Sequence, residues 1–426
     1  MKVLSYKWSI GQLKALLVVC LSALPLLSPN ALATSSFDMK GLIQIGLNQT
    51  ESNNSWLSPW LDGGVGVVRY DDGMQLNIDH ALLEFDYSFA NDWAVLGTVN
   101  YLADGNRRLG VSESYLQYKP IAKNYNNTFK VGLFYPQFSL ENSDIAWTSP
   151  FGNSFSAINS WVAEELRPLG VEWQIKRPGR RHNSPHSYTF TLAAYQHNDG
   201  LGSLLAWRGW AVHNRQSVFH EKIDFANYFQ FMPVENPNPT YVDISDETDN
   251  RVGYYIGGHW QYFRKTDVRL YFYDNLADPF SIEKDMQYGW RTQFWSVALQ
   301  HKFSPSFRIL AQVMTGNTEM GNMMKGVFSD FNSWYVLANF QHKDHRISLR
   351  YDSFFVTDDD TNPFDPNASD GDSVAINWRY MLNDNVHIGA EMLYVTSDNE
   401  NRELWPNWES RQSQEQMSLF VQLRFK

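Results

Sequence analysis

Basic side chains recur on one face of the strands that the sequence predicts. Every second residue of a strand points to the same side, and the basic residues fall on the side opposite the apolar one. Cationic groups on a wetted wall attract anions. The pattern predicts an anion-attracting wall, with a plain solvated surface as the alternative. The residues are Lys130, Arg269, Arg308, Arg346, Arg350, Arg379 and Arg424, accompanied on that side by Glu172, Asp352 and Glu391.

An acidic loop of residues 136–168 follows one of these strands and begins and ends at proline. We expect it to fold inward and to face the basic wall, which would set up a transverse field across a constriction. The alternative is a lid over the mouth. Its acidic residues are Glu141, Asp144, Glu164 and Glu165, with Arg167 as the basic one.

The same loop is rich in aromatic residues. Aromatic faces can stack against sugar rings, so a channel for saccharides is the alternative to a channel for anions. The alternative role is to pack the loop against a wall. The residues are Phe138, Trp147, Phe151, Phe155 and Trp161.

Catalytic and metal chemistry have weaker support. His387, Asp352 and Glu391 could belong to an outer-membrane hydrolase, but no nucleophile accompanies them, so we predict no enzyme activity. A structural or adhesive barrel is another possibility. The stretch "TDDDTNPFDPNASDGD" (357–372) could hold Ca²⁺, yet it lacks the regular spacing and terminal glutamate of a known calcium loop. We expect an acidic surface loop that divalent ions bridge only loosely, and we expect no cofactor.

The elements that must position these residues are strands. Runs with period-two alternation are long enough to cross a membrane when tilted. Such runs lie near 37–47, 76–89, 93–101, 112–118, 128–135, 169–176, 188–195, 251–262, 267–274, 290–303, 307–315, 331–341, 345–354, 373–382, 385–395 and 414–425.

The connections between these strands alternate in length. Short turns such as "RKT" (264–266) and "HKD" (342–344) alternate with long loops. Short turns on one side and long loops on the other are typical of outer-membrane barrels. We therefore predict an all-β transmembrane antiparallel barrel of about sixteen strands, closed by 414–425 against the first strand and wide enough for a channel. The 196–250 loop either adds a short hairpin or covers the mouth.

Composition agrees with a secreted barrel. Aromatic residues make up 15% of the 426 residues, and the net charge is −11, which disfavours nucleic acid as a partner. Lys2, Lys7 and Lys14 precede an apolar stretch, which predicts a signal peptide, 1–33, cleaved after Ala33. It would remove Cys20, the one cysteine. The barrel would then occupy 34–426.

One long stretch resembles a known family. "FKVGLFYPQFSLENSDIAWTSPFGNSFSAINSWVAEELRPLGVEWQ" (129–174) is similar to the phosphate-selective porin O and P family, and so are "HRISLRYDSFFV" (345–356) and "DGDSVAINWRYMLNDNVHIGAEM" (370–392). The resemblance implies a trimeric sixteen-stranded channel in which arginines and lysines guide anions. The loop departs from the family because it contains no lysine and is net acidic.

These observations together lead to one functional expectation. We expect a passive porin in the bacterial outer membrane that admits small hydrophilic solutes, including anions such as phosphate. Its partners would be outer-membrane lipid and lipopolysaccharide, and two further copies of itself in a homotrimer.

Overall fold

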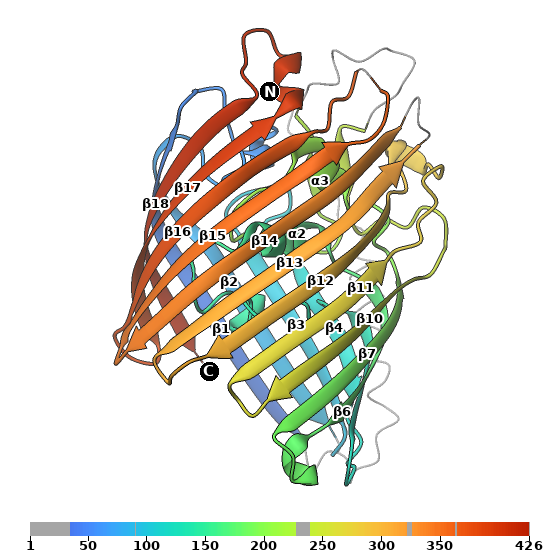
Figure 1. Ribbon diagram of the computed structural model, residues 1–426, viewed down its shortest axis with the longest axis vertical. Coiled ribbons are helices and arrows are strands. Elements are labelled where there is room, and N and C mark those ends of the chain that lie inside the picture. Colours follow the sequence, from blue (N-terminus) through green and yellow to red (C-terminus); the bar gives the residue numbers. More distant parts are fainter. Residues whose placement is uncertain (1–34, 90, 227–238, 322–325, 363, 426) are drawn as a thin grey trace.

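Sixteen strands form one closed antiparallel barrel in the computed structural model, which describes residues 35–425 except 90, 227–238, 322–325 and 363 (Figure 1). The predicted signal peptide therefore lies outside the described residues. The barrel strands are β1 (Ser36–Ser52), β2 (Gly73–Phe89), β3 (Trp93–Leu102), β4 (Leu109–Tyr118), β5 (Asn126–Leu133), β6 (Leu169–Arg177), β7 (His186–Gln196), β10 (Gly253–Tyr262), β11 (Thr266–Asp274), β12 (Arg291–Lys302), β13 (Phe307–Met320), β14 (Val327–His342), β15 (His345–Asp358), β16 (Ser369–Met381), β17 (Val386–Asn399) and β18 (Arg411–Phe425).

The closure predicted from the sequence is confirmed. β18 pairs with β1 in one continuous register from Gly41 opposite Phe425 to Ser52 opposite Gln414. The outward side chains of β18, from Met417 to Phe425, are between 38% and 58% exposed, whereas the alternate polar ones are buried inside. Alternation, interrupted in polarity only by the inward Phe420, gives this strand an exposed apolar outer face and a mostly polar inner face.

Connection lengths set two different ends of the barrel. The turns at 263–265, 303–306, 343–344 and 382–385 are short. They lie at the same end of the barrel as the first residue of β1 and the last residue of β18, and we call this the short-turn end. The opposite, long-loop end carries 53–72, 134–168, 197–252 and 400–410. The 103–108 connection also belongs to the long-loop end but is shorter than expected, because β3 and β4 both extend beyond the predicted runs.

The long loops contain the remaining regular structure. The 197–252 loop contains helix α3 (Ser203–Arg208) and a two-stranded sheet of β8 (Lys222–Asp224) and β9 (Tyr241–Asp243), so it does add a hairpin. Helix α2 (Ala157–Glu165) lies in the 134–168 loop. Short 3₁₀ helices span Trp60–Asp62, Ile145–Trp147, Gly179–His182, Lys284–Met286 and Glu400–Leu404. No helix among the described residues is long and apolar enough to cross a membrane.

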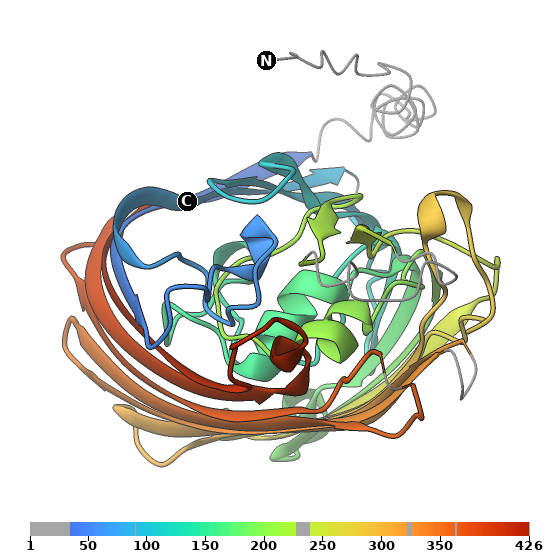
Figure 2. The same ribbon diagram turned by 90° about the horizontal axis from the view of Figure 1, so that it is seen from above.

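The main hydrophobic core lies inside the barrel rather than between layers. Seen along the barrel, the green helices at 157–165 and 203–208 lie within the ring of strands (Figure 2). Trp60, Trp161 and Trp210 from three different loops belong to one hydrophobic cluster with Phe294 and Phe331 of the wall, and all five side chains are buried. Three long loops therefore fold into the interior and pack against one another there.

Candidate functional site

Four arginines gather on the inner wall near the short-turn end. We call Arg308, Arg346, Arg379 and Arg424 the arginine cluster; they come from β13, β15, β16 and β18. β15 and β16 are adjacent, β13 lies beyond β14 and β18 lies beyond β17, so alternation brings the four side chains to one part of the interior.

The tip of the 134–168 loop reaches this cluster. Arg346 Nη1 donates to the Pro150 carbonyl at 2.7 Å, and Arg379 Nη2 donates to the Gly152 carbonyl at 3.3 Å. Arg308 and Arg346 lie over the ring of Phe151, with 5.6 and 5.9 Å from guanidinium carbon to ring centroid. The loop is thus held by the wall at its deepest point.

Three members of the cluster lack an acidic partner. Within the described ranges, no carboxylate oxygen lies within 4.0 Å of the guanidinium nitrogens of Arg308, Arg346 or Arg379, whereas Arg424 pairs with Asp144 at 2.6 Å. The neutral carbonyl groups accept hydrogen bonds from Arg346 and Arg379 but leave the charge of both guanidinium groups in place. A local excess of positive charge therefore lines this part of the interior.

The other three basic residues predicted for the wall form ion pairs with carboxylates or donate hydrogen bonds to the inward loop. Arg350 pairs with Glu141 at 3.2 Å and with Asp352 at 2.7 Å. Lys130 pairs with Glu172 at 2.9 Å. The Arg269 guanidinium donates to two loop carbonyls and lies 3.8 Å from Asp267. These residues anchor the loop and the wall, so the seven basic residues do not act as one set.

The four acidic residues of the loop likewise divide into two pairs. Asp144 and Glu141 meet the arginines of the wall, whereas Glu164 and Glu165 face the neighbouring loop. Glu164 pairs with Arg208 at 2.8 Å, and the Glu165 carboxylate accepts from the Leu204 backbone N–H at the start of α3 at 2.9 Å.

Burial separates the pKa values of these two neighbouring carboxyl groups. Burial raises the pKa of Glu165 to about 7, and the adjacent Glu164 carboxylate adds to the shift. Although burial opposes ionisation of Glu164 as well, Arg208 and His213 hold the pKa of Glu164 well below its usual range.

The aromatic residues of the loop pack against the wall. Phe138 makes edge contacts with Tyr271 and Phe294, with ring centroids 4.8 and 5.6 Å apart. Trp161 packs against Phe294 and Phe331 in the same way. Phe138, Phe151, Phe155 and Trp161 are at most 2% exposed, and Trp147 stacks on Tyr135 at 4.4 Å. Buried rings offer no face to a sugar, so these contacts correspond to the packing alternative.

The proposed catalytic residues are not brought together. Among the described residues, no hydrogen bond or ion pair joins His387 to Asp352 or Glu391. Asp352 accepts from the Ala157 N–H and pairs with Arg350, whereas Glu391 accepts from the Asn153 and Ser154 N–H groups. Both carboxylates therefore position the inward loop.

The acidic 357–372 stretch uses its carboxylates locally. Asp360 accepts from the Phe328 N–H at 3.0 Å and the Asn362 N–H at 2.7 Å, and Asp358 accepts from the Asn367 N–H at 3.1 Å. These bonds shape the loop. In the described ranges, both groups of side chains close enough to share a metal ion lie elsewhere, within 199–249.

Sequence reasoning missed a second charged network inside the long-loop end. Arg69 Nε donates to Asp104 at 2.6 Å, and Arg215 joins the same carboxylate at 3.2 Å while also pairing with Glu221. The network ties together the 53–72, 103–108 and 197–252 loops. Such residues have no periodic pattern, and their partners are remote in sequence, so the sequence carries no signal for them.

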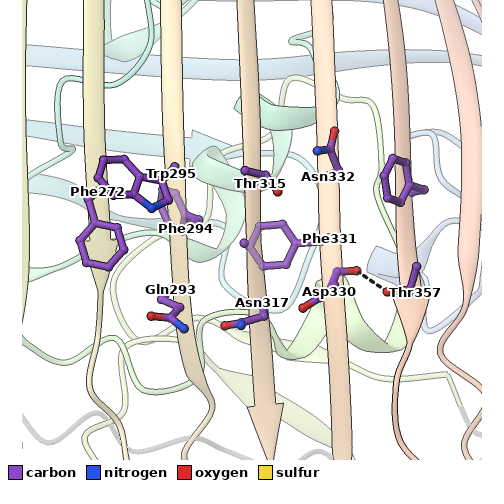
Figure 3. Close-up of a pocket in the computed structure, with 12 residues that line it drawn as sticks. Phe272, Gln293, Phe294, Trp295, Thr315, Asn317, Asp330, Phe331, Asn332 and Thr357 are labelled. Atoms are coloured by element: carbon purple, nitrogen blue, oxygen red, sulfur yellow. Dashed lines mark hydrogen bonds between the residues drawn. The ribbon is translucent and has the colours of Figure 1, made fainter.

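A concave surface on the outer wall lies where the exposed apolar residues of the strands give way to polar ones, towards the long-loop end. The cavity, about 480 Å³, lies over β11 to β15, with Phe272 and Trp295 on one side and Gln293, Asn317 and Asp330 below them in the view of Figure 3. Trp295 is 50% exposed and therefore outward-facing. Aromatic residues giving way to polar ones on an outer face are typical of a membrane interface.

Comparison with solved structures shows the fold of outer-membrane porins. DcaP, an outer-membrane channel of Acinetobacter baumannii, aligns with TM-score 0.55 and 12% identity over 92% of this chain and 98% of its own. An anion-selective porin from Comamonas acidovorans aligns with TM-score 0.51 and 10% identity over 92% of this chain and 100% of its own. The trimer form of OmpT of Vibrio cholerae gives TM-score 0.51 and 10% identity over 92% and 99%.

Sequence comparisons add nothing to this. No protein-family model matches the chain, and no curated protein matches it. At 10–12% identity the structural likeness defines the class of fold, a sixteen-stranded porin barrel.

Proposed function

We propose that this chain is a passive channel of the bacterial outer membrane for small hydrophilic solutes, with a preference for anions such as phosphate. The observation that carries the proposal is the set of three arginines, Arg308, Arg346 and Arg379, on the inner wall without a carboxylate partner in the described ranges. An arginine without a carboxylate partner keeps its full positive charge towards an anion inside the barrel, which favours a role in attracting solute.

The fold and the comparisons support the same proposal. Sixteen strands enclose a space too wide to be filled by wall side chains alone. Two proteins of similar fold are described as an outer-membrane channel and an anion-selective porin. The resemblance of 129–174 to the phosphate-selective porin O and P family points to the same class of solute.

The 136–168 loop is the proposed constriction. Its tip contacts the arginine cluster, and α2 lies inside the barrel. Asp144 and Glu141 compensate Arg424 and Arg350 locally, so the field across the passage would come mainly from the arginines that remain unpaired.

The remaining proposals concern maturation and assembly. We propose cleavage after Ala33, contact of the outer wall with outer-membrane lipid and lipopolysaccharide, and a homotrimer, as in the trimer form of OmpT. The mass of the purified chain tests the cleavage site, and native mass spectrometry tests the trimer. We propose no enzymatic role.

Reversal potential in a planar bilayer under a KCl gradient tests the selectivity. The wild-type protein should conduct and prefer chloride, and Arg308→Glu should shift the permeability ratio towards cations. Arg180→Glu is the matched control, because Arg180 is exposed in the 3₁₀ helix of a short-turn connection and has the same charge change. A cation-preferring wild-type pore, or equal shifts in both variants, would overturn the anion proposal; a folded protein without conductance would overturn the channel.

A further inference from the structure

Three metal-binding side chains converge beside the small β8–β9 sheet of the 197–252 loop. His220 precedes β8, Asp243 is the last residue of β9, and Asp246 follows in the next turn. The donor atoms of the three side chains all lie within 4.8 Å of one another.

The backbone around these residues fixes two of them. The His220 N–H donates to Ser245 Oγ at 3.1 Å, and Asp243 Oδ1 accepts from the Ser245 N–H at 3.0 Å. This second bond leaves Asp243 Oδ2 directed at His220, with 3.0 Å between Oδ2 and Nδ1. Asp246 Oδ1 lies 3.8 Å from the same nitrogen.

The spacing fits a tetrahedral ion. Ligands at about 2.0–2.1 Å from zinc lie roughly 3.3 Å apart along a tetrahedral edge. The nitrogen-to-oxygen distances of 3.0 and 3.8 Å bracket that value, so a metal could replace the imidazole proton with small movements. Within the described part of the chain, this imidazole is the one basic group that lies within 4.0 Å of the Asp243 and Asp246 carboxylates.

We propose that His220, Asp243 and Asp246 form a zinc-binding site at the long-loop end of the barrel, with water as the fourth ligand. One imidazole and two carboxylates suit zinc, which accepts nitrogen and oxygen ligands in a four-coordinate site. Calcium needs six to eight oxygen ligands and magnesium near-octahedral oxygen geometry, so both fit less well.

The partial exposure of His220 and Asp246 to solvent would let a zinc ion enter and leave the site. The side chain of His220 is 44% exposed and that of Asp246 is 28% exposed, whereas Asp243 is 6% exposed and positions the pair.

Bound zinc would link the two arms of the loop. His220 directly follows the segment that lies inside the barrel, where the Ser217 N–H donates to the Ala163 carbonyl of α2. Asp243 and Asp246 belong to the return arm. The metal would therefore fix one end of the inserted segment, independently of whether the barrel conducts anions.

The second group of this loop, Asp199, Glu247 and Asp249, carries no proposal. It is purely acidic, and its oxygens accept from the backbone N–H groups of Thr248, His197 and Asn250.

Isothermal titration of the detergent-solubilised full chain with ZnCl₂, in excess Ca²⁺ and Mg²⁺, tests the site. We expect one Zn²⁺ per chain, and at least a tenfold loss of affinity in His220→Ala, since even outer-shell changes cost about 10–100-fold. Asp246→Asn keeps the size and most hydrogen-bonding capacity of the side chain, and it should weaken binding in the same direction.

Two control variants separate this site from the rest of the chain. Asp224→Asn alters an exposed aspartate of β8, and His182→Ala alters a histidine at the short-turn end. Both should bind Zn²⁺ like the wild type. Folded wild-type protein that binds no Zn²⁺, or unchanged affinity in both His220→Ala and Asp246→Asn, would overturn the proposal.

Discussion

Arg346 on β15 and Arg379 on β16 are direct cross-strand neighbours, and both guanidinium groups bind carbonyls at the tip of one inward loop. Like charges placed directly opposite each other destabilise a sheet. Here the loop supplies neutral acceptors instead of carboxylates, so the pair keeps its charge while its geometry is fixed.

Neutralising one member of this pair should weaken anion binding. We expect Arg346→Gln to raise the phosphate concentration for half-maximal block of the current about tenfold, because a hydrogen bond to a charged group contributes about 1.5–3 kcal/mol. Single-channel recording with phosphate titration measures it. Arg264→Gln, in an exposed turn, is the control; an equal effect there would remove the special role of the pair.

Arg350 should contribute to stability rather than to selectivity. Arg350→Met leaves Glu141 and Asp352 buried without their cation, which should cost about 3–5 kcal/mol. The urea midpoint of the refolded protein in detergent measures this cost. Arg308→Met removes no ion pair in the described ranges and should shift the midpoint much less; equal shifts would contradict the assignment.

Removing residues 141–165 should enlarge the passage. The deleted segment includes α2 and side chains that are almost fully buried inside the barrel, so we expect a severalfold increase in conductance. Heat-modifiable migration on gels checks that the variant folds. Unchanged conductance of a folded variant would show that this loop does not limit the passage.

The stability of the interior should fall as pH rises towards 7. Folded Glu165 has a pKa of about 7 against 4.5 for a free glutamate, so the folded state holds a proton that the unfolded state has lost between these values. The free energy of unfolding should therefore decrease by up to about 1.4 kcal/mol per pH unit in this window.

Two neighbouring variants test this pH dependence. Glu165→Gln mimics the protonated form and should flatten the curve of urea midpoint against pH between 5 and 7. Glu164→Gln loses the pairing with Arg208 and should lower the midpoint at every pH. A wild-type midpoint that rises across this range would contradict the assignment.

The outer face of β18 should tolerate charge according to depth. Leu419→Arg places a cation within the apolar band and should cost about 2–4 kcal/mol, whereas Glu415→Arg, on the same face near the long-loop end, should cost about 0–1 kcal/mol. Unfolding midpoints in lipid vesicles compare the two. Equal costs would place the membrane boundary elsewhere.

All sixteen barrel strands could be predicted from the sequence because alternation follows directly from the two environments of the wall. Alternation is blurred in four of the predicted runs, 37–47, 76–89, 251–262 and 290–303, and for β2 the structure gives the reason. The register between β1 and β2 shifts at Gln44/Ile45, and both Asp79 and His80 are buried. A bulge therefore turns two consecutive side chains inward and interrupts the period of two.

The candidate site was less predictable than the wall. Periodicity placed Arg346 and Arg350 on the same face, yet one keeps an uncompensated charge and the other pairs with two carboxylates. That difference depends on where the loop residues Glu141 and Pro150 lie, which alternation does not specify. Arg69, Arg208 and Arg215 belong to loops without any period.

The pairing of β1 with β18 also has a kinetic consequence. Every other neighbouring pair in the barrel is joined by a single turn or loop, the longest being 197–252 between β7 and β10, whereas this pair joins opposite ends of the described chain. Contacts between remote segments carry the largest loop-closure entropy and form slowly. We expect the β1–β18 pairing to form last during assembly and to break first on unfolding. A circular permutant that links β18 to β1 by a short turn and opens the 343–344 turn should make this pairing local in sequence and speed up insertion.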